Sequence, residues 1–265
     1  MPLGNIKITW IQIDNYKAWT EKLGHDRESL IQTFQANLYS ETQKMFSKYG
    51  GILFASRYDN MLAIANNISP DQLREIQLQL TYRNPVSLSF GVGYGETPYV
   101  AQKEASKRLL TFSSKNPEKM AFAAPSTYDI SDGTVQIAHF DINDSTNLIT
   151  KRLSVYESHI LIQHIYDLLI PQLKKYGALI FFNGGDNFIS PSNGMIKENY
   201  EKIVDYVFKE TGLLLKAGVG IGNTAKEALA LANDGLHNMR KKKYDGNVNI
   251  KLGKQIHLNT IKKLH

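Results

Sequence analysis

The spacing of hydrophobic positions changes along the chain and predicts a mixed α+β protein. Apolar residues alternate imperfectly from Ile6 to Ile13, as in a strand, and recur at helical spacing from Arg27 to Lys48. Two short apolar runs then flank Arg57-Tyr58-Asp59-Asn60, which predicts a β-hairpin with Asp59 at its turn. The first half therefore reads as strand, helix, hairpin, helix, strand and helix, at residues 6–13, 27–48, 52–65, 70–80, 86–92 and 97–110.

The second half repeats this order at a constant offset of 127 positions. Asp14 recurs as Asp141 and Asp59 as Asp186, and most of the two halves align without a gap. The repeated segments are expected at residues 135–140, 153–175, 179–189, 197–209, 213–219 and 224–241, followed by a last strand, 248–252, with no clear counterpart in the first half. A register kept across loops and hydrophobic segments indicates a duplicated domain.

The order of elements in each half is that of a split βαβ, ferredoxin-like sheet with helices on one face. The predicted fold class is therefore α+β, with two tandem ferredoxin-like domains that arose by duplication. We expect an N-terminal domain over residues 1–112 and a C-terminal domain over residues 134–265. The stretch between them, 113–133, is rich in Pro, Ser and Asp-Gly and reads as a connector.

Two aspartates in each half are the main candidates for chemistry. In such a sheet the first strand lies beside the second strand of the hairpin, so Asp141 and Asp186 are expected to meet, as are Asp14 and Asp59. Converging carboxylates repel each other unless a cation joins them, and such a pair can hold two Mg²⁺ ions that bind a triphosphate. The backbone carbonyl of Ile142 is a further candidate ligand.

Glycines accompany these carboxylates. Gly184-Gly185 lets the hairpin turn adopt backbone angles closed to other residues and lets phosphate approach closely. Aspartate is also a common turn residue, but Asp-Asn is kept in both hairpins while its neighbours differ, which a turn requirement alone explains poorly. The Gly-x-Gly-x-Gly runs that begin at Gly91 and Gly218 resemble a phosphate loop, although close packing of strand against helix is the favoured explanation.

Composition narrows the chemistry further. The apolar fraction of 42% and the charged fraction of 21% are ordinary for a soluble globular protein. The sequence has no cysteine, which excludes disulfides and thiolate zinc sites, so a metal would be held by carboxylates, which favours Mg²⁺ or Mn²⁺. The formal charge of +6 suits a phosphorylated ligand or simply a lysine-rich surface.

The same composition sets expectations about partners and location. Tyr244 is the one aromatic residue among the C-terminal lysines, so nucleic acid is not an expected partner. No apolar stretch reaches ~18 residues, and the start lacks the features of a leader, so we expect a cytoplasmic protein with no membrane partner.

Three segments of the second half carry a family resemblance. They are Phe140-Asp141-Ile142-Asn143, Gly184-Gly185-Asp186-Asn187-Phe188 and residues 232–240. Together they resemble the catalytic domain of GGDEF diguanylate cyclases and the palm domain shared by nucleotidyl cyclases and polymerases. The resemblance implies that Arg240 meets phosphate where that family has Lys, and that Asn187 replaces an acidic metal ligand. The first half has Ser113 at the register of Arg240, so we favour the second half as the catalytic one.

Longer motifs extend the resemblance to the whole chain, from about Ile8 to Leu252. They include residues 11–16, 57–60, 96–103, 135–139, 184–188, 191–195 and 216–222. In these segments the chain is similar to archaeal GTP cyclohydrolase III, a tandem duplication of the palm fold.

This resemblance implies a Mg²⁺-dependent enzyme that opens the imidazole ring of GTP and releases its two outer phosphates as orthophosphate. The implied product is 2-amino-5-formylamino-6-ribosylamino-4(3H)-pyrimidinone 5′-phosphate, an early intermediate towards flavin and deazaflavin cofactors. A monovalent cation such as K⁺ near the guanine carbonyl and a homo-oligomer, a dimer or a tetramer, are implied as well.

The expected site residues follow from these motifs. The catalytic candidates are Asp141, Asp186, Asp14 and Asp59, and the metal ligands are Asp141, Ile142 and Asp186. The substrate-binding candidates are Gly184, Gly185, Asn187, Asn193, Lys216, Arg240 and Asn143. Candidates for reading the guanine base are Asn15, Asn143, Asn147 and Asn193.

Two other functions stay open at this point. A nucleotidyl or diguanylate cyclase would use the same carboxylates but let a ribose hydroxyl attack the α-phosphate. A nucleotide-sensing module with a degenerate site would need no metal pair, and intact aspartates in both halves argue against it. Which half holds the metals, and how many GTP sites each chain has, also stay open.

Overall fold

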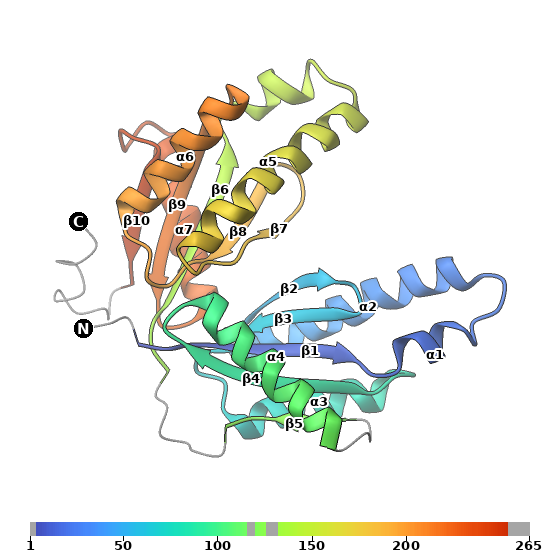
Figure 1. Cartoon of the computed structure of the whole chain (residues 1–265). Helices are drawn as coiled ribbons and strands as arrows, with labels where there is room; N and C mark the ends of the chain where they lie inside the picture. Colours follow the sequence, from blue (N-terminus) through green and yellow to red (C-terminus); the bar gives the residue numbers. More distant parts are fainter. Residues whose placement is uncertain (1–3, 116–119, 126–131, 254–265) are drawn as a thin grey trace.

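The structure is a computed structural model that describes residues 4–115, 120–125 and 132–253. Each half of the chain forms one five-stranded sheet, and Figure 1 shows the blue-to-green half below the yellow-to-red half. The first half contains β1 (Ile6–Ile13), α1 (Tyr16–Thr20), α2 (Arg27–Lys48), β2 (Ile52–Arg57), β3 (Asn60–Ile64), α3 (Pro70–Arg83), β4 (Leu88–Gly95), α4 (Pro98–Lys115) and β5 (Phe122–Ala123). The second half contains β6 (Val135–Ile142), η1 (Thr146–Thr150, a π-helix), α5 (Val155–Lys175), β7 (Phe181–Phe182), β8 (Asn187–Pro191), α6 (Lys197–Thr211), β9 (Leu215–Gly222), α7 (Ala225–Arg240) and β10 (Val248–Leu252).

The sheet order confirms two tandem ferredoxin-like domains. In the first sheet the order is β2-β3-β1-β4-β5, and β1 runs antiparallel to both β3 and β4. The second sheet repeats it as β7-β8-β6-β9-β10. The central strand of each domain is thus the first strand of its half, as the split βαβ arrangement requires.

Strand β10 was expected to have no counterpart in the first half, and this expectation was wrong. Strand β5 pairs in parallel with β4, as β10 pairs with β9. With two residues, β5 is too short to show an alternating pattern, and its strand character comes from the hydrogen bonds to β4. The stretch expected as a connector therefore contributes an edge strand to the first sheet.

Helices cover both faces of each sheet, which corrects the expectation of helices on one face. In Figure 1, α4 lies in front of the first sheet, while α2 and α3 lie behind it. Ile11 and Ile13 of β1 pack in the core with α2 and α3, whereas Ile6 and Ile8 pack on the opposite face with Ala101 of α4. Because β1 is buried on both faces, its apolar residues alternate imperfectly.

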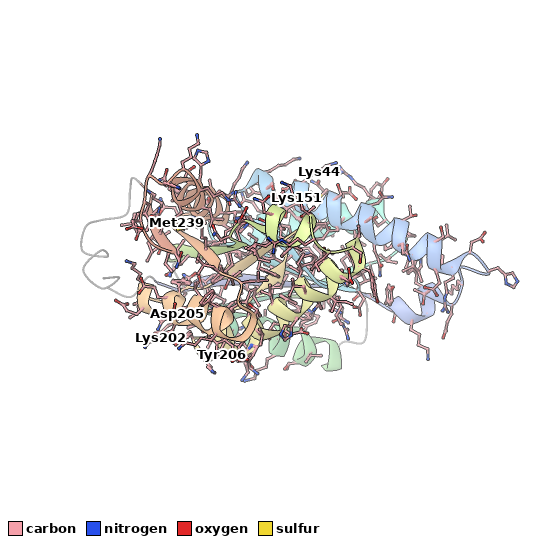
Figure 2. The ribbon with its side chains drawn as sticks, turned by 90° about the horizontal axis from the view of Figure 1, so that it is seen from above. Lys44, Lys151, Lys202, Asp205, Tyr206 and Met239 are labelled. Carbon is pink, nitrogen blue, oxygen red and sulfur yellow. The ribbon has the colours of Figure 1, made fainter. Side chains whose placement is uncertain are left out.

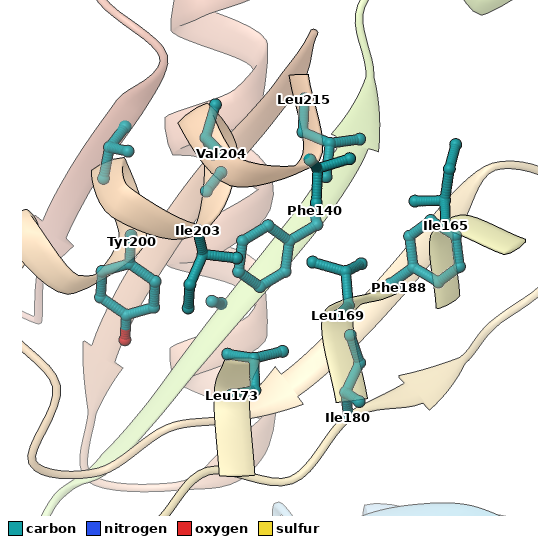
Figure 3. Close-up of a cluster of buried hydrophobic side chains, with 14 of the residues drawn as sticks. Phe140, Ile165, Leu169, Leu173, Ile180, Phe188, Tyr200, Ile203, Val204 and Leu215 are labelled. Atoms are coloured by element: carbon teal, nitrogen blue, oxygen red, sulfur yellow. The ribbon is translucent and has the colours of Figure 1, made fainter. Parts of the chain in front are cut away.

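The core of the second half has the same construction. Figure 3 shows Phe140 of β6 between side chains of α5 and α6, and Phe188 of β8 beside Ile165 of α5. Helix α6 is amphipathic. Ile203 and Val204 are buried against the sheet, whereas Lys202 and Asp205 lie on the outer side of the helix (Figure 2). None of the helices within the described ranges has the length and hydropathy needed to cross a membrane.

The two halves pack through equivalent surfaces related by an approximate two-fold axis. Phe54 stacks on Phe181, its own repeat mate, with ring centroids 4.4 Å apart. The backbone N–H of Tyr99 donates to the carbonyl of Gly177 at 2.9 Å, and the mate of this bond joins Lys226 to Gly50 at 2.9 Å. A surface that meets its own copy in this way is self-complementary, as in a symmetric dimer.

The repeated glycines of β4 and β9 serve close packing. A Cβ atom added at Gly220 would overlap the backbone oxygen of Ala228 in α7, and one added at Gly93 would overlap that of Ala101 in α4. The helix therefore lies directly on the strand, which confirms the packing explanation for these runs.

Candidate active site

Two carboxylates of the second half face one open cavity at the end of the sheet. Asp141 is the last residue but one of β6, and Asp186 lies in the turn before β8. The cavity has a volume of about 410 Å³ and is lined by Asp141, Ile142, Asn143, Asp144, Ser145, Thr146, Asp186, Asn187 and Arg240. Antiparallel pairing of β6 with β8 places Asp141 opposite Asn187, the residue after Asp186, and so brings the two carboxylates to the same edge.

Arg240 supplies a positive charge inside this cavity. Its Nη2 lies 2.6 Å from Oδ1 of Asp141, whose side chain is 8% exposed, while the Arg240 side chain is 53% exposed. The hydrogen bond to Asp141 raises the pKa of the Arg240 guanidinium above its ordinary value, and the charges of Asp141 and Asp186 act in the same direction. Arg240 therefore stays charged, and its exposed end is accessible from the solvent.

The hairpin between β7 and β8 depends on its glycines. Gly184 and Gly185 have φ angles of +93° and +62°, which side-chain-bearing residues rarely adopt. The backbone N–H of Asn187 donates to the carbonyl of Gly184 at 3.1 Å and closes the turn. The glycines thus allow the tight turn that presents Asp186 to the cavity.

His139 and Asn233 form a polar chain beside the hairpin that the sequence analysis did not identify. His139 Nε2 lies 2.8 Å from Oδ1 of Asn187, and Nδ1 lies 2.7 Å from Oδ1 of Asn233 in α7. Asn187 in turn donates from Nδ2 to Oδ1 of Asp186 at 3.4 Å. His139 is two residues before Asp141, and alternate residues of a strand project from the same face. The sequence alone could therefore have placed His139 on the same face of β6 as Asp141.

Two of the other expected residues lie near the carboxylates. Lys216 of β9 is the cross-strand neighbour of Asp141, so their side chains project from the same face of the sheet. Asn143 lines the cavity, and its backbone N–H donates to the carbonyl of Leu214 at 2.8 Å.

Asn193 does not lie at the cavity, and this corrects the expectation that it binds substrate. Its side chain is fully buried beyond the far end of β8. Oδ1 accepts from the backbone N–H of Gln136 at 2.9 Å, and Nδ2 donates to the carbonyl of Thr134 at 2.7 Å. Both polar ends are thus committed to holding the second domain together.

The remaining asparagine candidates are on the surface. Asn147 donates to Asp144 at 2.6 Å and accepts from Lys151 at 2.8 Å, and it lies in η1 beside the cavity. Asn15 belongs to the first half, where it precedes α1 with a φ of 48°.

The equivalent aspartates of the first half have different partners. Asp14 accepts hydrogen bonds from the hydroxyls of Ser87 and Ser89 at 2.8 and 2.6 Å and from the backbone N–H of Met120 at 2.9 Å. Asp59 pairs with Arg57 at 2.9 Å. Three donors already occupy the Asp14 carboxylate, whereas Asp141 has Leu214 and Lys216 at the repeat positions of the two serines.

Comparison with known proteins identifies the family. The family model described as GTP cyclohydrolase III matches residues 8–252. The chain belongs to the GTP cyclohydrolase III family.

Two curated members of the family illustrate the similarity. GTP cyclohydrolase III of Methanocaldococcus jannaschii is 41% identical over 244 residues, covering 92% of this chain and 91% of that protein. The Methanococcus vannielii protein of the same name is 38% identical over 242 residues, covering 91% of each chain.

Among solved structures, the active GGEEF domain of a diguanylate cyclase from Vibrio cholerae matches with a TM-score of 0.36 and 16% identity, covering 46% of this chain and 85% of that chain.

The donor atoms of the cavity fit a hard divalent cation such as the Mg²⁺ that this family resemblance implies. Asp141 and Asp186 offer carboxylates, and Ile142 offers a backbone carbonyl. In the described part of the chain no three His, Cys, Asp or Glu side chains converge as a metal cluster. Mg²⁺ commonly uses one or two carboxylates and takes its other ligands from water and substrate phosphates, so this donor set suits Mg²⁺ better than zinc.

Proposed function

We propose that this protein hydrolyses GTP and opens the imidazole ring of its guanine. One water adds at C8 and the C8–N9 bond breaks, so that the carbon stays on N7 as a formyl group. Two further waters hydrolyse the two phosphoanhydride bonds, and the two outer phosphates leave as orthophosphate. The product would be 2-amino-5-formylamino-6-ribosylamino-4(3H)-pyrimidinone 5′-phosphate. The observation that carries this proposal is the family match over residues 8–252, and the oxygen-lined cavity of the second half supports it.

We assign the metal site to Asp141, Asp186 and the Ile142 carbonyl of the second half. When bound there, a pair of Mg²⁺ ions would lower the pKa of a bound water and neutralise the charge of the triphosphate. The first half is the weaker candidate, because Asp14 already accepts three hydrogen bonds, from Ser87, Ser89 and the Met120 N–H. A monovalent cation such as K⁺ near the guanine carbonyl, and assembly into a homo-oligomer, belong to the same proposal.

The other residues of the cavity would bind and orient the triphosphate. Arg240 would exchange its hydrogen bond with Asp141 for one to phosphate, and its exposed guanidinium can make that move without unfolding α7. Lys216 would add positive charge on the same face of the sheet. Gly184 and Gly185 leave room for phosphate to approach the hairpin. His139, through Asn187, would hold Asp186 in place.

Paired substitutions in the two halves test this assignment. Asp141→Asn and Asp186→Asn should each lower turnover of GTP by orders of magnitude with little loss of fold, because each removes a metal ligand and keeps side-chain volume. The repeat mates Asp14→Asn and Asp59→Asn are matched controls and should change turnover far less. Equal losses in both halves, or normal turnover in the second-half variants, would reject the assignment.

A nucleotidyl or diguanylate cyclase is the second candidate, since the hairpin Gly184-Gly185-Asp186 is also a feature of that class. It would attack the α-phosphate with a ribose hydroxyl and leave the purine intact. The ultraviolet spectrum separates the two reactions, because ring opening removes the absorbance pattern of the purine and cyclisation preserves it. A purine spectrum that survives complete consumption of GTP would favour the cyclase.

A further inference from the structure

A second cavity lies between the two halves, away from Asp141 and Asp186. Its volume is about 300 Å³, and both halves contribute to its lining. The side chains that define its chemistry are Trp10, Ser56, Tyr99, Gln102, Tyr166 and Lys174. Ser56 lies one residue before the Arg57-Asp59 pair, so the cavity adjoins the first-half hairpin.

The lining combines aromatic rings with unused polar groups. The indole N–H of Trp10 donates to Asn60 Oδ1 at 3.1 Å, and the Tyr166 hydroxyl donates to the Ile180 carbonyl at 3.1 Å, so both rings are held in place. In contrast, among the described residues no hydrogen bond involves the side chain of Ser56 or Gln102. Fixed rings with free amide and hydroxyl groups are what a planar heteroaromatic ligand needs.

Positive charge gathers at one wall of this cavity. The ammonium group of Lys174, which lines the cavity, lies 5.5 Å from the centroid of the Tyr99 ring, and that of Lys103, which lies outside the lining, is 5.9 Å from it. Lys174 comes from the second half and Tyr99 from the first, so the two halves build this wall together. An ammonium group beside an aromatic ring suits a ligand that carries a phosphate.

The repeat relates each residue of this cavity to a mate 127 positions away, and most of the polar and charged residues of the cavity differ from their mates. The framework is common to both sides, because Tyr166 has Tyr39 as its mate and Phe181 has Phe54. Five residues that give the cavity its polarity and charge are not repeated: the mates of Trp10, Ser56, Tyr99, Gln102 and Lys174 are Ile137, Asn183, Lys226, Leu229 and Ser47. The differences between the two sides therefore include the groups that would meet a ligand.

We propose that this inter-domain cavity is a second nucleotide site, which binds a nucleoside monophosphate independently of the carboxylate cavity. The base lies against Trp10 and Tyr99, with Gln102 and Ser56 hydrogen bonded to its edge and Lys174 paired with the phosphate. A cavity of about 300 Å³ is at the lower end of the range for small-ligand sites, which suits a nucleoside whose phosphate is at the mouth.

Fluorescence of Trp10 gives a direct test. The sequence has two tryptophans, so a Trp19→Phe background leaves Trp10 as the single reporter. GMP is the probe, and EDTA is present so that no metal can bind at the carboxylates. The expected result is saturable quenching of Trp10 emission by GMP and none by ribose 5-phosphate, which has the phosphate but no base. Isothermal titration calorimetry on the same samples measures binding without relying on the reporter.

Variants locate the binding site. Lys174→Ala should weaken GMP binding roughly tenfold, the effect expected for losing a charge-assisted hydrogen bond. Lys175→Ala is the matched control, because Lys175 is the exposed neighbour and donates to Gln172. Gln102→Leu, which installs the residue found at the mate position, should also weaken binding. Circular dichroism confirms that each variant is folded.

GMP binding at this cavity can be tested separately from GTP turnover at the carboxylate cavity. Asp186→Asn should abolish turnover of GTP and leave the GMP titration unchanged. Absence of both quenching and heat at millimolar GMP would overturn the proposal. Binding that Asp186→Asn removes and Lys174→Ala preserves would overturn it as well, because GMP would then occupy the carboxylate cavity.

Discussion

Removal of Arg240 is the sharpest test of how the carboxylate cavity works. In the structure Arg240 is the hydrogen-bond partner of Asp141, at 2.6 Å, and the Asp141 side chain is only 8% exposed. Arg240→Ala therefore leaves a largely buried carboxylate beside Asp186 without its hydrogen-bonded cation. Two consequences follow, one for metal-free protein and one for the protein with substrate.

The magnitude follows from the geometry of the pair. A hydrogen bond to a charged group contributes about 1.5–3 kcal/mol, and because the Arg240 side chain is half exposed, solvent screening brings the estimate to about 1–2 kcal/mol. Metal-free Arg240→Ala should therefore melt a few degrees below the wild type. Since a metal no longer has to displace the guanidinium from Asp141, Mn²⁺ affinity without nucleotide should rise by roughly 5- to 30-fold.

Substrate binding should change in the opposite direction. If Arg240 pairs with the triphosphate, its loss should raise KM for GTP roughly 10-fold or more. Ser113→Ala, at the same register in the first half, and Lys241→Ala, next to Arg240, serve as controls and should change neither KM nor Mn²⁺ affinity. The measurements are electron paramagnetic resonance titration with Mn²⁺, thermal melting with and without metal, and steady-state kinetics.

One result would refute this reasoning. If Arg240 only complements the negative end of α7, its removal would lower Tm slightly and leave both KM and Mn²⁺ affinity unchanged. That outcome would rule out a phosphate-binding role for Arg240. The difference between Arg240 and Ser113 would then no longer be a reason to place catalysis in the second half.

The pH dependence of stability offers no substitute test. The raised pKa of Arg240 means that its contribution is lost only as pH rises through that value, which lies far above neutrality.

Three further predictions concern the metal and the fold. EDTA should abolish turnover, and Mg²⁺ or Mn²⁺ should restore it; recovery with Zn²⁺ alone would contradict the oxygen-donor site. Gly220→Ala should lower Tm by roughly 10 °C or more because its Cβ overlaps the α7 backbone, whereas Gly212→Ala, with nothing within 4 Å, should lower it by only a few degrees. Tyr200→Phe should cost about 1–3 kcal/mol in denaturant titrations, because it breaks two buried hydrogen bonds, and Tyr206→Phe on the same helix should cost little.

Local pattern was enough to predict most elements of the fold. Helix α2 has the bounds that the periodicity and the following glycines indicated, and β10 spans the residues that were expected for it. Both signals are local, since a helix repeats its buried face within a few residues and glycine ends it. The constant offset of 127 positions extended the same prediction to the second half, and the convergence of Asp141 with Asp186 followed from the sheet order alone.

Tertiary packing decided the rest, because it depends on residues that are distant in the sequence. Strand β5 exists only through its pairing with β4, and the burial of Asn193 depends on the backbone at Thr134 and Gln136. Asp14 and Asp141 occupy equivalent positions in the repeat, yet Asp14 accepts hydrogen bonds from Ser87 and Ser89, whereas Asp141 pairs with Arg240.

The two-fold packing of the halves is another such feature. Gly50 and Gly177 are repeated glycines with positive φ angles, which the sequence analysis could interpret only as helix stops. In the folded chain each carbonyl also accepts a hydrogen bond from the opposite half. A short stretch of sequence specifies which conformations its own backbone prefers, but it contains no information on which distant surface will meet it. That choice is made when the two sheets pack and exclude water from the surface between them.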